Sequence, residues 1–288
     1  MNRTFSVLAP AKINLGLKVL PKREDGFHAI ESIFSTVSLC DEVCITLTDK
    51  KNTCNVKCDL MELPKKNTIS SSYEGFQKIS GKDLPGVDVL IKKKIPSGGG
   101  LGGGSSDGAS FIKAFNRLSG LALSHDQLRQ IAAMVGSDVF FFLECDDSGK
   151  GAAIVTGRGE VVETVRRRND LHFVMIFPGV HSSTKEAYSL VDEFYESGNK
   201  LEYPVLDELE SIYNSSVEKW NFVNTFTSVI SKKYSRVEQA IFDLSKNGAL
   251  YTDMSGSGST VFGIFASEAD AEKARITLSD SWNVCYCC

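Results

Sequence analysis

The stretch that decides the fold is KKKIPSGGGLGGGSSDGASFIKAFNRLSG, residues 92–120. Six glycines fill positions 98–104, interrupted only by Leu101. Because glycine loses more backbone entropy on folding than any other residue, such a run requires a specific use. The residues after it predict an α-helix that Gly120 would end, since apolar side chains recur at helical spacing: Phe111, Ile112, Phe115 and Leu118.

A bare backbone directly before a helix suits the binding of phosphate. Glycines let backbone N–H groups approach phosphate oxygens closely, and the helix N-terminus adds the positive end of its dipole. Ser105 and Ser106 supply hydroxyl groups where the helix begins, and the lysines at 92–94 add positive potential. We therefore predict a phosphate-binding loop; a flexible linker or a tight strand-to-helix turn is the alternative.

Two common nucleotide loops do not fit this stretch. The Walker A pattern fails, because Gly104 stands where that pattern requires lysine. The protein-kinase motifs H-R-D and D-F-G are absent. Gly98, Gly100 and Gly103 do satisfy G-x-G-x-x-G, but Asp126, at the distance of the expected ribose ligand, opens a helix instead. A Rossmann-like NAD-dependent oxidoreductase remains an alternative.

Composition narrows the class of protein. The chain has 288 residues, of which 42% are hydrophobic and 24% charged, with a net charge of −4. An acidic balance argues against a nucleic-acid partner, and no apolar run approaches the roughly 20 residues of a membrane span. The first residues are poor signal-peptide material, so we expect a cytoplasmic protein. Eight cysteines are present, of which Cys40/Cys44 and Cys54/Cys58 are each four apart and fit buried thiols on one face of a strand, and we predict no metal site among the eight.

The order of elements predicts a mixture of strands and helices. Strand patterns occur at residues 4–20 (as a strand pair), 31–48, 87–95, 151–165 (as a hairpin) and 171–179. Helical patterns occur at 124–136, with a capping box between Ser124 and Gln127, and at 184–197, 236–248 and 268–280. Residues 198–235 are expected to be a polar connection. The arginines at 166–168 are interpreted as a solvated edge near a domain boundary.

Three motifs together resemble the GHMP small-molecule kinases. APAKINLGL (residues 9–17) is similar to the first motif, PSGGGLGGGSSDGA (96–109) to the second and MSGSGSTVFGIF (254–265) to the third. The resemblance implies an α+β, two-domain GHMP kinase fold. Its N-terminal domain, residues 1–168, would resemble ribosomal protein S5 domain 2, and its C-terminal domain, residues 169–288, would be ferredoxin-like.

Other segments resemble particular members of these kinases, namely DGFHAIESIF (25–34), GSDVFFF (136–142) and FPGVHSST (177–184). They imply phosphorylation of a CDP-linked sugar alcohol in non-mevalonate isoprenoid synthesis. ATP is the implied donor, with Mg²⁺ carried by the ATP and no protein ligand assigned. We expect small-molecule substrates, no nucleic-acid partner, no membrane association, and a monomer or weak homodimer. Homoserine, mevalonate or galactose phosphorylation, or a non-catalytic nucleotide-binding module, are the nearer alternatives.

The resemblance also implies the site residues. Asp138 would accept the proton of the attacking hydroxyl, although an aspartate before an apolar run is equally often a helix N-cap. Lys12 would stabilise the moving phosphoryl group, although a lysine in an apolar strand can also snorkel to water. The implied ATP-binding residues are Asn67, Pro96, Gly98, Gly99, Gly100, Leu101, Gly102, Gly103, Gly104, Ser105 and Ser106. The implied substrate-binding residues are Asn14, Phe27, His28, Thr184, Tyr188, Gly256 and Ser257.

One segment departs from the family pattern. The family often has Asn-Asp, an apolar residue and Glu where this chain reads FVNTFT, residues 222–227. Asn224 is kept, but Thr225 and Thr227 are neutral. An acidic pair therefore has no counterpart here.

Overall fold

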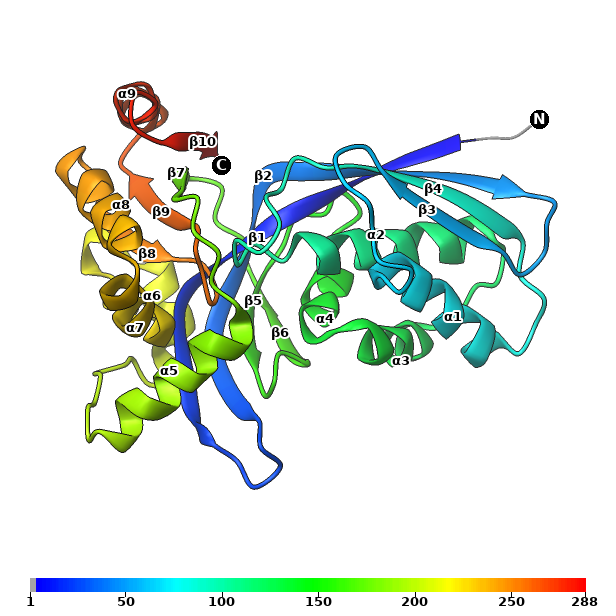
Figure 1. The fold of residues 1–288 in the computed structure, drawn as a ribbon, viewed down its shortest axis with the longest axis horizontal. Coiled ribbons are helices and arrows are strands. Elements are labelled where there is room, and N and C mark those ends of the chain that lie inside the picture. Colours follow the sequence, from blue (N-terminus) through cyan, green and yellow to red (C-terminus); the bar gives the residue numbers. More distant parts are fainter. Residues whose placement is uncertain (1–3) are drawn as a thin grey trace. The chain divides into compact units, whose positions relative to one another are not determined.

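The computed structural model describes residues 4–288, and two long strands begin it (Figure 1). Strand β1 spans Thr4–Lys22 and β2 spans His28–Thr48. The expectation of a strand pair within residues 4–20 is wrong, because β1 runs through this segment without a turn. Strand β1 pairs with β2 at an edge of the sheet, and such a position tolerates Pro10, which lacks a backbone N–H.

The chain forms two compact units, each assembled from three segments. Unit 1 comprises Met1–Ala11, Leu39–Ile95 and Gly102–Gly151. Unit 2 comprises Lys12–Ser38, Pro96–Leu101 and Ala152–Cys288. Strands β1 and β2 and the glycine loop therefore each contribute residues to both units, and a division at residue 168 stays a prediction.

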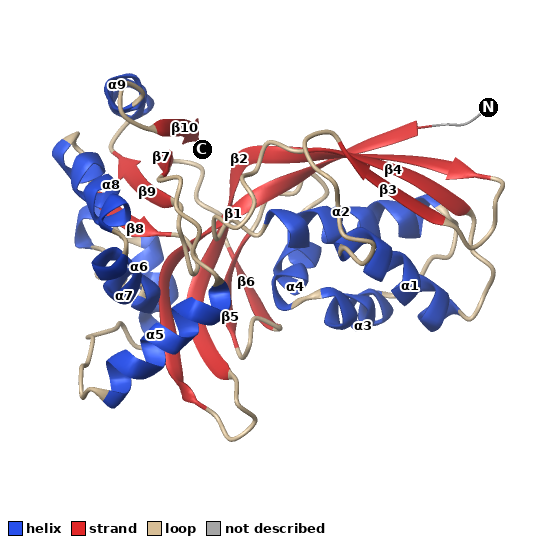
Figure 2. Cartoon of the chain, viewed as in Figure 1, coloured by secondary structure: helices blue, strands red, loops and turns tan. Residues whose placement is uncertain are grey.

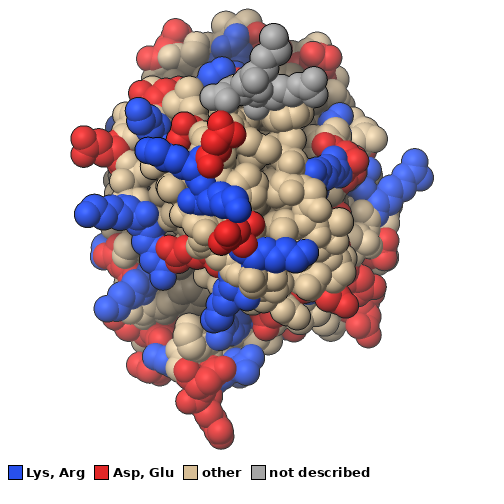
Figure 3. All heavy atoms as spheres, turned by 90° about the vertical axis from the view of Figure 1, so that its right-hand side faces the viewer, with Lys and Arg blue, Asp and Glu red and all other residues tan. Residues whose placement is uncertain are grey.

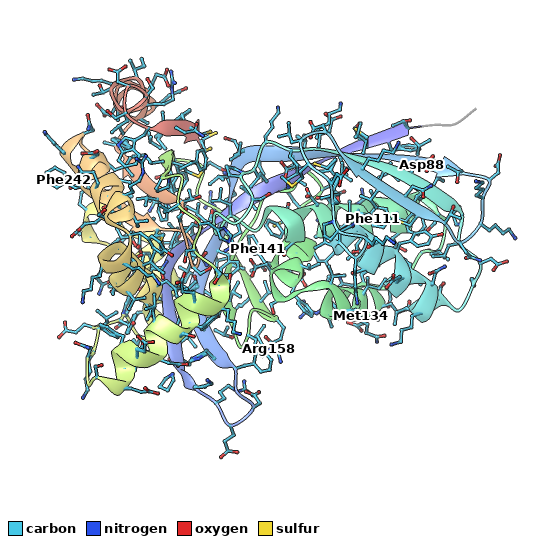
Figure 4. All side chains as sticks on the ribbon, viewed as in Figure 1. Asp88, Phe111, Met134, Phe141, Arg158 and Phe242 are labelled. Atoms are coloured by element: carbon cyan, nitrogen blue, oxygen red, sulfur yellow. The ribbon has the colours of Figure 1, made fainter. Side chains whose placement is uncertain are left out.

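Unit 1 is a sheet covered by helices. Strand β3 (Cys54–Cys58) runs parallel to β4 (Gly86–Lys92), and β4 runs antiparallel to β2. Four helices lie on one face of these strands (Figure 1): α1 (Thr68–Ser80), α2 (Gly103–Leu118), α3 (His125–Val135) and α4 (Ser137–Glu144). Figure 4 labels Phe111 on α2, whose ring stacks on that of Phe115 at 5.3 Å inside this helical layer.

The predicted helix ends of unit 1 are confirmed. Ser124 and Gln127 form the capping box of α3. Helix α2 ends at Leu118, and Gly120 follows with a φ of +69°, a left-handed conformation that favours glycine.

Unit 2 contains a second, antiparallel sheet with the strand order β10-β7-β9-β8. The strands are β7 (His172–Phe177), β8 (Tyr251–Met254), β9 (Val261–Phe265) and β10 (Asn283–Cys287). Helices α8 (Ser235–Lys246) and α9 (Glu268–Leu278) pack on these strands. Several helices connect β7 to β8. When they are taken together as one helical connection, the order of elements is β-α-β-β-α-β, the ferredoxin-like arrangement that the resemblance implies.

Unit 2 contains further elements, which Figure 2 colours as helices and strands. They are the predicted hairpin of β5 (Ala152–Thr156) and β6 (Val161–Val165), and the helices α5 (Thr184–Glu196), α6 (Leu209–Asn214) and α7 (Thr225–Lys233). Two 3₁₀ turns, Leu206–Glu208 and Val217–Lys219, flank α6. The polar connection expected at 198–235 is therefore wrong, since two helices lie within it.

The solvated edge expected at the arginines is also wrong in part. Arg168 donates hydrogen bonds to the carbonyl oxygens of Tyr213 (2.8 Å) and Ser215 (2.7 Å), and it pairs with Asp170. A guanidinium has five donors in a fixed fork, which suits this bridging of backbone carbonyls. Arg168 therefore fixes the C-terminal end of α6.

Charges on the outer surface are mixed. On the face shown in Figure 3, lysine and arginine side chains are interspersed with acidic ones. Within residues 4–288, no helix combines the length and apolar character needed to cross a membrane.

Candidate active site

The three glycine-containing motifs meet within unit 2. The backbone N–H of Lys12, in the first motif, donates to the carbonyl oxygen of Leu101 in the second at 2.9 Å. The Ser255 hydroxyl, in the third motif, donates to the carbonyl oxygen of Gly100 at 3.0 Å. The backbone N–H of Thr260 donates to the carbonyl oxygen of Gly99 at 3.2 Å. Segments about 90 and 155 residues apart in the chain therefore form one backbone framework.

Close approach within this framework requires glycine. Gly100 has a φ of +78°, and a Cβ placed on it would lie 2.0 Å from the carbonyl oxygen of Ser255. Gly98 has a φ of +73° and lies against the ring of His181. Any other residue at position 100 would both strain the backbone and push the third motif away.

Lys12 and Asn14 point to the same side of β1 and contact each other. The Lys12 ammonium donates to the Asn14 side-chain oxygen at 2.7 Å, and the Asn14 amide donates to the Ser32 hydroxyl at 3.1 Å. Lys12 is only 4% exposed and its Nζ lies 4.7 Å from the centre of the Phe34 ring. The interpretation of Lys12 as a lysine snorkelling to water is therefore wrong.

The third motif is fixed from two sides. The hydroxyl groups of Thr184 and Ser257 lie 3.2 Å apart, which brings two predicted substrate-binding residues together. The Asn224 amide donates to the carbonyl oxygens of Met254 (2.7 Å) and Gly256 (2.9 Å). The sequence singled out Asn224 only because it matches the family pattern within residues 222–227, a segment that otherwise differs from that pattern. Nothing in the sequence indicated its two carbonyl partners.

His28 and Tyr188 are also brought together in unit 2. Their rings stack with centres 5.0 Å apart. His28 Nδ1 lies 2.8 Å from the carbonyl oxygen of Leu20, so this nitrogen carries a hydrogen, and Nε2 lies 3.2 Å from Asp192. Phe27 is half exposed and packs against the guanidinium of Arg158, 4.2 Å from its ring centre; Figure 4 labels Arg158.

In unit 1, the start of α2 presents unobstructed backbone. Gly102 is the N-cap with a φ of +68°, and no side chain caps the helix. The first helical residues are therefore Gly103, Gly104, Ser105 and Ser106. Gly103 has an ordinary helical φ, and it is close packing that restricts it: a Cβ there would lie 3.0 Å from Ile95. Uncapped N–H groups at such a terminus favour an anion.

The predicted residue Asn67 opens the neighbouring helix. Its side-chain oxygen accepts the backbone N–H groups of Ile69 (3.1 Å) and Ser70 (3.0 Å) at the N-terminus of α1. It also lines a cavity of about 920 Å³ on unit 1, together with residues of β3 and β4 that include Val56, Lys57, Leu90 and Asp88, the last labelled in Figure 4. This volume lies in the range of small-molecule sites.

Asp138 lies in the first turn of α4 and is half-buried. Gly136, not Asp138, is the N-cap of that helix. The interpretation of Asp138 as the helix cap is therefore wrong, while its role as a catalytic base stays a prediction. Among residues 4–288, no group of three or more His, Cys, Asp or Glu side chains is arranged to hold a metal ion.

The family of the chain follows from two domain matches. Residues 67–145 match the family described as GHMP kinases N terminal domain. Residues 204–283 match the family described as GHMP kinases C terminal. The first match spans Asn67 and α2, and the second spans Asn224 and the third motif.

Relatives of similar length extend this likeness over the chain. A protein of Treponema pallidum (strain Nichols) called 4-diphosphocytidyl-2-C-methyl-D-erythritol kinase is 34% identical, covering 99% of this chain and 97% of its own. A protein of the same name from Thermotoga maritima is 38% identical, covering 88% of this chain and 90% of its own.

Solved structures share the fold. A crystal structure of 4-(cytidine 5'-diphospho)-2C-methyl-D-erythritol kinase superimposes with a TM-score of 0.77 at 26% identity, covering 98% of both chains. The homoserine kinase of Cytophaga hutchinsonii shares the fold with a TM-score of 0.69 at 20% identity, covering 98% of this chain and 93% of its own.

The chain belongs to the GHMP kinases, in the family of the two relatives named above. It is an enzyme that uses ATP to phosphorylate an alcohol group. The predicted α+β fold and kinase class are thereby confirmed. The Rossmann-like alternative is wrong, because β4 pairs antiparallel with β2 directly before the glycine loop, where a dinucleotide-binding unit has parallel strands.

Proposed function

We propose that this protein transfers the γ-phosphoryl group of ATP to the 2-hydroxyl of 4-diphosphocytidyl-2-C-methyl-D-erythritol, a step of non-mevalonate isoprenoid precursor synthesis. Full-length similarity to kinases named for that substrate carries the proposal. The convergence of the three motifs in unit 2 supports it, because a kinase needs its donor and acceptor groups on one rigid framework.

The phosphate groups of ATP bind at the glycine loop and the first turn of α2. Gly98–Leu101 supply bare backbone, and Gly102–Ser106 supply the uncapped helix N-terminus. The nucleoside part of ATP enters the cavity beside Asn67. A magnesium ion arrives with the phosphates and neutralises charge on them when bound.

The protein is expected to act as a monomer or weak homodimer in the cytoplasm.

Asp138 accepts the proton of the attacking hydroxyl as the oxygen bonds to the γ-phosphorus and ADP leaves. Lys12 places a buried positive charge at the reacting phosphoryl group. Asn14 orients Lys12 through their 2.7 Å hydrogen bond and is itself held by Ser32. This chain of contacts fixes the position of the ammonium.

The acceptor is held by the His28–Tyr188 stack and by the third motif. A cytosine ring stacks on Tyr188, which is half-buried, or on Phe27, which is half exposed. Thr184, Gly256 and Ser257 offer hydroxyl and backbone groups to the diphosphate. Hydrogen bonds to the edge of the ring distinguish cytosine from uracil. A base without the matching polar group leaves buried groups of the site unpaired, and this lowers its reactivity as a substrate far more than a mismatch in an apolar pocket does.

A coupled ADP-release assay tests the proposal with four acceptors: the CDP-linked alcohol, its UDP analogue, mevalonate and homoserine. The CDP-linked alcohol should give the highest kcat/KM. His28→Ala should raise the KM of this acceptor and reduce the preference for cytosine over uracil, while the KM of ATP changes little. Preference for mevalonate or homoserine would contradict the substrate assignment and leave the kinase class intact.

A further inference from the structure

Three buried charged side chains hold the chain on both sides of the glycine loop. Asp41 on β2 accepts the backbone N–H groups of Lys94 (2.6 Å) and Ile95 (2.8 Å), and it pairs with the Lys93 ammonium. Lys93 also donates to Asp107 Oδ2, on α2, at 3.0 Å. Residues 93–95 lead into the loop and Asp107 follows it. The positions of both loop ends therefore depend on this cluster, which we call the stem cluster (Asp41, Lys93 and Asp107).

The charges of the stem cluster do not balance when both carboxyl groups are ionised. Lys93 supplies one positive charge for two carboxylates, and the three side chains are 9% or less exposed. Two desolvated carboxylates that share one cation favour protonation of one of them. Ionisation of both would leave one negative charge next to the uncapped N-terminus of α2, and it would oppose the field that attracts phosphate there.

Asp107 is the carboxyl group that takes the proton. Asp41 accepts three donors, whereas Asp107 Oδ1 is buried and has no hydrogen-bond partner among residues 4–288. A buried carboxylate oxygen without a donor is costly, and protonation removes that cost. Burial raises the pKa of Asp107 to about 7; Lys93 lowers this pKa and Asp41 raises it. These two are the charged groups that act on Asp107 within the described chain.

We infer that the stem cluster positions the glycine loop, and that Asp107 carries a proton when the loop holds a triphosphate. The inference rests on the proposed function, because it places ATP at this loop. The arrival of the negative triphosphate makes ionisation of Asp107 less favourable still. Binding above pH 7 therefore takes up a proton, and Asp107 acts as a positioning residue whose charge sets the affinity of the loop.

Calorimetric titration with the magnesium complex of a non-hydrolysable ATP analogue measures this proton directly. Titrations at pH 8 in two buffers with different ionisation enthalpies give the number of protons taken up. The wild type should take up close to one proton, and its Kd should rise by up to about tenfold per pH unit above pH 7. Asp107→Asn, which mimics the neutral acid, should remove both effects and bind the analogue at pH 8 at least as tightly as the wild type.

Asp126→Asn is the matched control, because Asp126 lies exposed in the first turn of the adjacent helix α3. It should behave as the wild type. Equal proton uptake by the wild type and Asp107→Asn would overturn the inference. So would a wild type that binds the analogue without proton uptake, a result that requires no variant to fold. A wild type that does not bind the analogue at any pH would overturn the proposed function itself.

Discussion

The side-chain amide of Asn224 donates a hydrogen bond of 2.9 Å to the carbonyl oxygen of Gly256, which joins the N-terminus of α7 to the third motif. The same amide donates to Met254, and the Asn224 oxygen accepts the backbone N–H of Phe226 at 2.9 Å. Asn224 is 1% exposed. One buried side chain therefore caps a helix and holds the backbone beside Gly100 and the rest of the glycine framework.

Asn224→Ala should weaken both the fold and the site. It leaves the carbonyl oxygens of Met254 and Gly256 without these donors in a buried place, at a cost of about 1–3 kcal/mol in the free energy of unfolding. Urea unfolding measures this loss, and kcat/KM for the acceptor should fall as well. Asn199→Ala, at an exposed asparagine whose amide donates to the carbonyl oxygen of Phe194, should change neither quantity much. Equal effects of the two variants would contradict the role of Asn224.

Gly100→Ala should damage ATP binding because of a specific collision. The new Cβ would lie 2.0 Å from the carbonyl oxygen of Ser255, and the φ of +78° would be strained. We expect the KM of ATP to rise by about tenfold or more, equivalent to ~1.4 kcal/mol. Gly120→Ala has a similar φ but open space around it, so it controls for backbone strain alone. If both variants keep the wild-type KM, the loop does not hold ATP.

Asp138→Asn should leave ATP binding nearly intact and lower kcat by roughly 10²–10⁴, the usual loss for a positioned acid–base group. The fold should tolerate the change, because Gly136 rather than Asp138 caps α4. Lys12→Met should also lower kcat. Single-turnover rates and thermal unfolding of the same preparations separate chemistry from stability. An Asp138→Asn protein with normal turnover would remove this residue from the reaction.

Asp253 should make stability depend on pH. It accepts hydrogen bonds from the Thr227 hydroxyl, the Tyr251 hydroxyl and the backbone N–H of Met254, and no cation pairs with it among residues 4–288. Burial raises the pKa of Asp253 to about 6, against the lowering effect of these donors. The folded protein thus binds a proton that the unfolded chain releases near pH 4.

The sign of the effect follows from this difference. The stabilising contribution of Asp253 is complete below about pH 4 and is lost as pH rises through about 6, an effect on the order of 3 kcal/mol. Asp253→Asn should remove this part of the pH dependence of the free energy of unfolding, whereas Asp207→Asn, on the exposed turn before α6, should not. Urea unfolding at pH 4.5 and 7.5 measures it. An unchanged slope in Asp253→Asn would contradict this assignment.

Much of the fold could be predicted because local signals were strong. The Ser124–Gln127 capping box and the apolar periodicity of α2, α5, α8 and α9 are properties of short windows of sequence. Helix α7 was missed because Thr225–Lys233 is rich in serine and in the β-branched residues threonine, valine and isoleucine, whose helix propensity is weak, and tertiary packing compensates for it. Strand β1 was divided wrongly because Pro10 and Gly16 resemble turn residues, although an edge strand accommodates them.

The residues of the candidate site likewise include some that the sequence could predict and some that it could not. The glycines and Lys12 stand in recognisable motifs, so the sequence named them. Asn224 and the stem cluster act through partners 14 to 54 residues away, and no local pattern reports such pairing. The contacts of His28 with Leu20 and Asp192 could likewise not be predicted, because they depend on how β1, β2 and α5 pack.

Phosphorus NMR of the complete reaction tests the central claim most directly. Purified enzyme, ATP, magnesium and 4-diphosphocytidyl-2-C-methyl-D-erythritol should produce one equivalent of ADP and one new phosphomonoester resonance. Mass spectrometry of the product should then show the added phosphate on the 2-hydroxyl, with the diphosphate link to cytidine intact. ADP accompanied only by inorganic phosphate, or no turnover of this acceptor while another alcohol is phosphorylated, would contradict the proposed function.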